Sequence, residues 1–113
     1  MTASIYVSIT GLRVKAFWHL PTFWRYAVPA MVQAKSAQGC LQADARTING
    51  VKHTRTVWES EAAMRAFLYE GAHLDAIRAF RKIATGKTFG AEMQDIPDWP
   101  TVHQMWCDRG RDY

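Results

Sequence analysis

Residues Leu41–Trp58 have the sequence LQADARTINGVKHTRTVW. Two runs rich in residues that favour strands flank Asn49-Gly50, the dipeptide that tolerates positive φ at both central positions of a tight hairpin turn. The stretch therefore predicts two antiparallel strands, Leu41–Ile48 and Val51–Trp58, joined by a two-residue turn.

The turn also fixes which residues lie opposite one another, because side chains alternate between the two faces of a strand. Without a bulge, the expected pairs are Ile48/Val51, Arg46/His53, Asp44/Arg55, Ala45/Thr54, Ala43/Thr56 and Leu41/Trp58. One face is then small, apolar and aromatic, and the other is polar. Asp44 and Arg55 are expected to form a solvated cross-strand ion pair, worth at most about 1 kcal/mol.

Upstream of the hairpin, the sequence predicts a strand followed by a helix. Ile5–Leu12 alternates apolar and polar residues, as a strand buried on one face does. From Leu20 to Ser36 the apolar residues recur at helical spacing. Pro21 suits the first turn of this helix, whereas Pro29 is expected to kink or interrupt it.

Downstream of the hairpin, the sequence predicts a second helix. Ser60 is its candidate N-cap, and Gly71 is expected to break or bend it. The helical pattern resumes beyond Gly71 and is expected to end at Gly86. Thr88–Gln94 is a candidate fourth strand, and Pro97–Asp108 a short helix or cover.

This order of elements predicts an α+β fold of ferredoxin-like βαββαβ type with an antiparallel sheet. We expect a single domain over residues 1–113, with a core of about residues 4–94 and a carboxy-terminal extension over residues 95–113. Helices on one face leave the other face of the sheet open. That face needs a partner or water to cover it.

Composition and charge exclude several classes of function. The 14 basic and 10 acidic residues are interspersed and form no basic stripe, so nucleic-acid binding is disfavoured. The two cysteines are far apart in the sequence, as expected of free thiols in a reducing compartment. The first twelve residues, MTASIYVSITGL, resemble neither a signal peptide nor a membrane span, so a cytoplasmic location is expected.

Few residues carry recognisable chemistry. His103 and Cys107 are one helical turn apart, a two-ligand spacing too common to predict a metal, and neither cysteine has a base recognisable beside it. His73 lies on an apolar helical stripe one turn before Ile77, where it could transfer protons, bind a metal centre, hydrogen-bond to a nearby carbonyl, or line a dimer seam. Trp58 is either a core residue or one wall of a cavity floored by Thr54 and Thr56.

The run Thr56–Phe67 (TVWESEAAMRAF), followed by Gly71-Ala72-His73, resembles the antibiotic-biosynthesis-monooxygenase group of the dimeric α/β-barrel superfamily. The element order agrees over about residues 4–94. The resemblance implies a ferredoxin-like protomer whose sheet packs on a second copy, with a pocket between sheet and helices. Members include cofactor-independent oxygenases of aromatic polyketides, haem-degrading enzymes and binding proteins, so the fold leaves the function open.

The chain departs from the haem-degrading branch of that superfamily. Phe67 occupies the place of a second tryptophan, and Ile77 lies near the place of the haem-ligating histidine. The asparagine of the first strand has no clear match among Ser8, Thr10 and Gly11. Haem bound through His73 in another register stays an alternative, since the aromatic stretch from Phe17-Trp18-His19 to Trp24-Arg25 is similar to that of haem-dependent carotenoid monooxygenases.

The function predicted from these observations is that of a small oxygenase-like enzyme, an oxidoreductase that needs no cofactor. It would bind a flat or hydrophobic organic molecule, with His73 transferring protons and Arg55 or Arg46 stabilising an enolate-like anion. The alternatives are a haem-binding protein or haem-dependent monooxygenase that uses His73, and a non-catalytic ligand-binding module. The expected ligand-binding residues are Trp58, Phe67, Trp24, Ile77, Thr54, Thr56 and Thr10.

Overall fold

A computed structural model describes residues 4–68 and 71–112, apart from the side chains of Ala72 and His73. The elements are β1 (Ile5–Val14), a 3-10 turn η1 (Phe17–His19), α1 (Leu20–Ser36), β2 (Cys40–Ile48), β3 (Val51–Trp58), α2 (Glu61–Leu68), α3 (Gly71–Ile83), β4 (Ala84–Met93), α4 (Trp99–Arg109) and β5 (Arg111–Asp112). The predicted α+β order is confirmed, and β5 is an addition to it.

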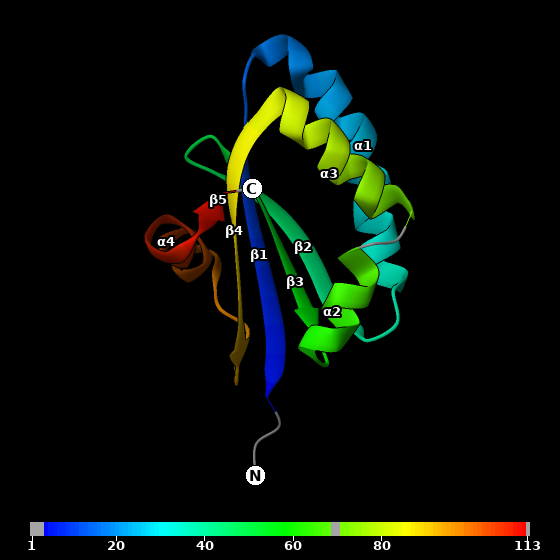
Figure 1. Cartoon of the computed structure of the whole chain (residues 1–113). Helices are drawn as coiled ribbons and strands as arrows, with labels where there is room; N and C mark the ends of the chain where they lie inside the picture. Colours follow the sequence, from blue (N-terminus) through cyan, green and yellow to red (C-terminus); the bar gives the residue numbers. More distant parts are fainter. Residues whose placement is uncertain (1–3, 69–70, 113) are drawn as a thin grey trace.

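The strands form one antiparallel sheet in the order β2-β3-β1-β4-β5. Figure 1 shows α1, α2 and α3 on one side of this sheet and α4 on the other. We call these the inner and outer sides of the sheet. Within the described residues, no helix has both the length and the apolar character needed to cross a membrane.

The hairpin forms as predicted at its turn and differs at its far end. Asn49 and Gly50 have φ values of 50° and 77°, and the pairs from Ile48/Val51 to Ala43/Thr56 are confirmed. A bulge between Cys40 and Gln42 then places Trp58 opposite Cys40, so the expected Leu41/Trp58 pair is wrong. The extra residue of a bulge has no partner on the neighbouring strand, and Leu41 is accordingly exposed.

The predicted helices form, but α1 and α3 each differ from the prediction in one respect. The helix α1 continues through Pro29, contrary to the expected interruption, because a proline removes only one hydrogen bond and buried residues on both sides anchor the two halves. Ser60 caps α2 by accepting a hydrogen bond from Ala63 N at 3.2 Å. The helix α3 ends at Ile83, before the expected Gly86, because β4 already pairs with β1 from Ala84 onward.

The outer side of the sheet is covered by the chain itself. On this side, β1 and β3 carry four fully buried apolar side chains that pack with Val102 and Trp106 of α4; they are Val7, Ile9, Val51 and Val57. The predicted carboxy-terminal helix is therefore a cover for the face that was expected to be open to a second copy.

Candidate functional site

A cavity of about 750 Å³ lies between the inner side of the sheet and helices α1, α2 and α3. Apolar side chains of α1 and α3 form its roof, among them Phe23, Ala27, Ile77 and Phe80. Hydroxyl-bearing side chains of the sheet form its floor. A volume of this size suits a small organic molecule.

The hydroxyl floor follows from the register of the three central strands. Thr88, Thr10 and Thr54 lie side by side in one row across β4, β1 and β3, and Ser8 and Thr56 pair in the next row. Because side chains at every second position share a face, these five residues all point to the inner side. The result is a polar floor under an apolar roof.

Trp58 supports this floor from outside the cavity. Its indole is fully buried, lies 5.1 Å from the Phe67 ring between centroids, and donates a hydrogen bond from Nε1 to Thr56 Oγ1 at 2.8 Å. Within the described part of the chain, the hydroxyls of Ser8, Thr10 and Thr54 have no hydrogen-bond partner. They are therefore free to bind a polar group of a ligand.

The cavity opens between α1 and the edge strand β2. Trp24, Val28 and Val32 recur every four residues along α1, line the cavity and are 47, 55 and 62% exposed. Ala45 and Thr47 of β2 also line it and are exposed. Large apolar side chains that stay exposed along one helix face indicate an open binding surface.

The ionisable groups around the cavity are mostly basic. The ammonium group of Lys52 lies 5.1 Å from the centroid of the Trp24 ring and 5.7 Å from that of Phe23, which holds this cation against the aromatic end of the roof. The other basic side chains that line the cavity are Lys35, Arg46 and Arg81, and Asp112 is an acidic one. The excess of positive charge favours an anionic ligand.

Six of the seven expected ligand-binding residues line the cavity: Trp24, Phe67, Ile77, Thr54, Thr56 and Thr10. The seventh, Trp58, lies behind the floor. The sequence analysis missed Lys52 and Ser8. The alternation along β3 that assigns Thr54 and Thr56 to the cavity also assigns Lys52 to it, and this signal was available in the sequence.

The two expected catalytic residues are not brought together. The backbone of His73 belongs to α3, and its side chain lies outside the described residues. Arg55 is on the outer side of the sheet and does not line the cavity, because it alternates with Thr54 and Thr56 along β3. Arg46 borders the cavity from the exposed edge strand, although it pairs with His53, which lies on the outer side.

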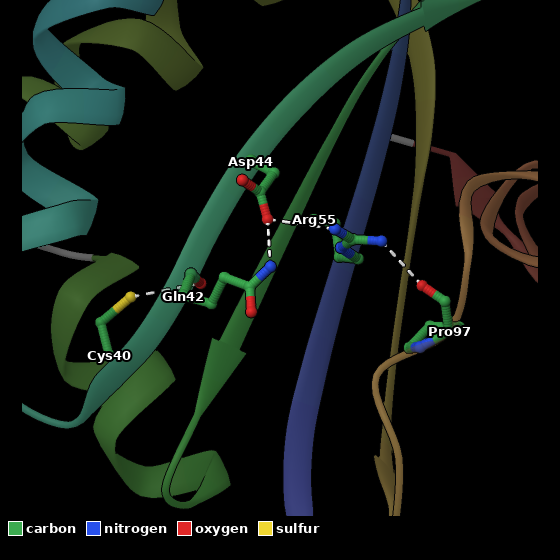
Figure 2. A network of polar contacts seen from close by, with 5 residues as sticks. All are labelled: Cys40, Gln42, Asp44, Arg55 and Pro97. Carbon is green, nitrogen blue, oxygen red and sulfur yellow. Dashed lines mark hydrogen bonds and ion pairs between the residues drawn. The ribbon is translucent and has the colours of Figure 1, made fainter.

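Arg55 instead fastens the segment before α4 to the sheet. Its guanidinium donates to Asp44 Oδ2 at 3.0 Å and to the carbonyl of Pro97 at 2.8 Å, as Figure 2 shows. The Trp99 ring covers it, with the guanidinium carbon 4.3 Å from the ring centroid. The predicted Asp44–Arg55 pair is confirmed, but it is solvated on one side only, since the Asp44 side chain is 39% exposed and the Arg55 side chain 10%.

The environment of Asp44 favours its ionised form. The hydrogen bond from the Gln42 amide is the largest effect and lowers the pKa of the Asp44 carboxyl. Burial opposes it, and the hydrogen bond and charge of Arg55, with the charge of Lys35, keep the pKa below its usual value. The carboxylate therefore stays charged at neutral pH and keeps its hold on Arg55.

His53 is buried on the same outer side. Its Nδ1 lies 3.3 Å from the Thr10 carbonyl, and its Nε2 lies 2.8 Å from Nδ1 of His103 on α4. Burial lowers the pKa of His53, and the nearby positive charge of Arg13 and the imidazole of His103 act in the same direction. The Thr10 carbonyl opposes this shift without reversing it.

We expect the stability of the protein to fall in mildly acidic solution because of His53. A histidine in the unfolded chain has a pKa of about 6.5, so below that pH the unfolded state binds more protons than the folded state does. The contribution of neutral His53 is complete above this pH and is lost as the pH falls through the window between the two pKa values. Melting temperatures measured between about pH 7.5 and about pH 5.5 should decrease by a few degrees.

His53→Gln should flatten this decrease, since glutamine keeps a hydrogen-bonding side chain but does not titrate. His19→Gln, on η1, is the matched control and should leave it unchanged. If the melting temperature of His53→Gln fell with pH as steeply as that of the unmodified protein, His53 would not be the cause of the decrease.

The sequence matches no known protein-family model and no curated protein. Solved structures do resemble the fold. A Nitrosomonas europaea protein provisionally named an antibiotic biosynthesis monooxygenase has a TM-score of 0.70 at 13% identity, over 81% of this chain and 90% of its own. A variant of SnoaB, a cofactor-independent oxygenase from Streptomyces nogalater, has a TM-score of 0.64 at 12% identity, over 85% of this chain and 97% of its own.

A Deinococcus radiodurans protein with the same provisional name has a TM-score of 0.68 at 18% identity, over 81% of this chain and 96% of its own. These similarities extend over nearly the whole length of the neighbours. The resemblance to the antibiotic-biosynthesis-monooxygenase group is thus confirmed as a resemblance of fold. The chain shares the ferredoxin-like α+β fold of these structures, one of which is named a cofactor-independent oxygenase.

Proposed function

We propose that the protein is a small oxygenase-like enzyme whose cavity binds a flat, hydrophobic organic molecule with an acidic hydroxyl group. The observation that supports this proposal most directly is the cavity itself, with its apolar roof, its hydroxyl floor and Lys52 at its aromatic end. An apolar body matches the roof, and a phenolate or enolate oxygen matches the hydroxyls and the ammonium group.

Such a substrate can react with oxygen without a cofactor. A phenol, quinol or enol that loses a proton becomes electron-rich enough to reduce dioxygen. In a reaction that converts a CH₂ group to a carbonyl, one oxygen atom enters the substrate and the other leaves as water with the two hydrogens removed. The protein then needs only to bind the anion, exclude water and move protons, and His73 is the residue that we propose for the proton transfer.

Replacing Lys52 tests the proposed anion site. Lys52→Met keeps a flexible apolar chain but removes the charge, so oxygen consumption with a panel of quinols and naphthols should fall by about tenfold or more. Lys82→Met on the exposed side of α3 is the matched control and should keep full activity. Equal activities of the two variants would exclude Lys52 from the site.

The same samples distinguish the alternative functions. A Soret band that is lost in His73→Ala would support haem binding and exclude the cofactor-free reaction. Binding of a naphthol without any oxygen consumption would identify a ligand-binding module. Loss of oxygen consumption in His73→Ala at an unchanged melting temperature would support proton transfer by His73.

The homodimer and the cytoplasmic location are kept as predictions. Because α4 already buries the outer side of the sheet, a second copy would have to contact α4 or the sheet edges instead of a bare sheet. Native mass spectrometry of the purified protein tests the assembly. The cavity lies within one chain, so the proposed activity does not depend on the result.

A further inference from the structure

Cys107 and His103 lie together on α4, on the side of the sheet opposite the cavity. The Sγ atom of Cys107 is 3.7 Å from Nε2 of His103, a distance suited to a hydrogen bond to sulfur, and the Cys107 side chain is exposed to solvent. The sequence placed the two residues one helical turn apart, and the structure shows that the imidazole is within reach of the thiol. A thiol, a base within reach and a third group that orients the base are the parts of an activated nucleophile.

His53 is the orienting group, and its surroundings determine where the protons lie. Its Nδ1 faces the carbonyl of Thr10, which only accepts, so Nδ1 carries the hydrogen. Nε2 of the neutral ring must then accept, and His103 Nδ1 donates to it at 2.8 Å. The second nitrogen of His103, Nε2, is left with a lone pair that points to Cys107.

Packing holds this chain of groups in place. His53 is 1% exposed, and the Trp106 ring contacts both imidazoles, with centroids 5.1 Å from His53 and 5.9 Å from His103. When His103 takes up a proton, its two N–H groups have acceptors in His53 and in the thiolate. A base that is fixed in one tautomer and stabilised when charged is the arrangement required for thiol activation.

We propose that Cys107 is a reactive thiol, activated by His103 and oriented through His53, that exchanges with small disulfides. His103 Nε2 takes the thiol proton, and the thiolate attacks one sulfur of the disulfide. A new bond forms between Cys107 Sγ and that sulfur as the old disulfide bond breaks. The released thiolate takes its proton from His103, so the products are a mixed disulfide on Cys107 and one free thiol.

The second cysteine has no access to this site. Cys40 packs among the residues of the inner side of the sheet and donates from Sγ to the Gln42 carbonyl at 3.6 Å (Figure 2). Cys107 is on α4 at the outer side. Burial raises the pKa of the Cys40 thiol, which makes it a slow-reacting thiol in the same molecule. The mixed disulfide on Cys107 therefore persists until an external thiol reduces it, and Cys40 serves as an internal reference.

Alkylation kinetics test the proposal on the intact protein. The reagent is iodoacetamide at neutral pH, and mass spectrometry follows the two cysteine peptides separately. Cys107 should react about tenfold faster in the folded protein than in urea, because a free cysteine is only a few per cent thiolate at this pH. His103→Gln should reduce the folded rate to the urea rate or below. The thiolate absorbance in the ultraviolet should be present in the unmodified protein and absent from Cys107→Ser.

Two variants test the role of His53, and they differ in whether the new side chain can accept a hydrogen bond from His103. His53→Gln retains an acceptor for His103 and should keep most of the thiolate absorbance, whereas His53→Leu should lose it. Glutathione disulfide should then modify Cys107 and leave Cys40 free, releasing one equivalent of thiol. Folded Cys107 that reacts no faster than in urea would overturn the proposal, and this comparison decides the matter even if a histidine variant fails to fold.

Discussion

Replacing Trp106 by alanine is expected to lower the free energy of unfolding by about 3 to 5 kcal/mol, the range found for removal of a buried aromatic side chain. Trp106 is 7% exposed and donates from its indole nitrogen to the Lys87 carbonyl at 2.9 Å. It also packs against the imidazole of His53. Urea unfolding followed by circular dichroism measures the loss.

Trp18→Ala is the matched control, since Trp18 is 67% exposed and should change the stability by less than about 1 kcal/mol. Gly11→Ala tests the same contact from the opposite side. A β-carbon on Gly11 would lie 2.4 Å from two atoms of the Trp106 indole, so the tryptophan would have to leave its position. Equal losses for Trp106→Ala and Trp18→Ala would show that α4 contributes little to the fold.

Ala45→Trp is expected to abolish ligand binding while leaving the fold intact. Ala45 is exposed, lines the cavity from β2, and pairs with Thr54 of the hydroxyl floor. An indole at this position would occupy the opening between β2 and α1, and because it replaces solvent it should not strain the core. Affinity for a naphthol-type ligand, measured by fluorescence titration, should fall by at least about tenfold, the effect of losing about 1.4 kcal/mol of binding free energy.

Leu41→Trp adds a large indole to the same strand at a position that is also exposed and does not line the cavity. This variant should bind the ligand normally. Normal binding by Ala45→Trp would place the ligand elsewhere in the molecule. Loss of binding in both variants would point to a general effect on β2.

The local signals in the sequence predicted most of the elements and much of the candidate site. The Asn49-Gly50 turn fixed the hairpin register over five pairs, and Ser60 marked the start of α2. The same register brought Thr54 and Thr56 onto the cavity side. These predictions succeed because turn geometry and side-chain alternation involve residues close in the sequence.

The errors arose where a contact distant in the sequence outweighs a local preference. Pairing with β1 extends β4 back to Ala84, and packing on both sides carries α1 through Pro29. The bulge at Cys40 and Gln42 changes the partner of Trp58. No local pattern shows how two strands adjust to each other once the sheet is assembled.

By itself, the sequence determined the order of the elements, the hairpin and its two faces, since these depend on backbone preferences and on an alternation of period two. Only the tertiary structure decided what covers the opposite face of the sheet, which α4 of the same chain closes. That choice brings His53 of β3 against His103 of α4, 50 positions away in the chain, and puts Arg55 beneath Trp99. The physical reason is that a helix buries its apolar stripe against a sheet surface that excludes water from the stripe. Such a surface exists only after strands distant in the sequence have paired.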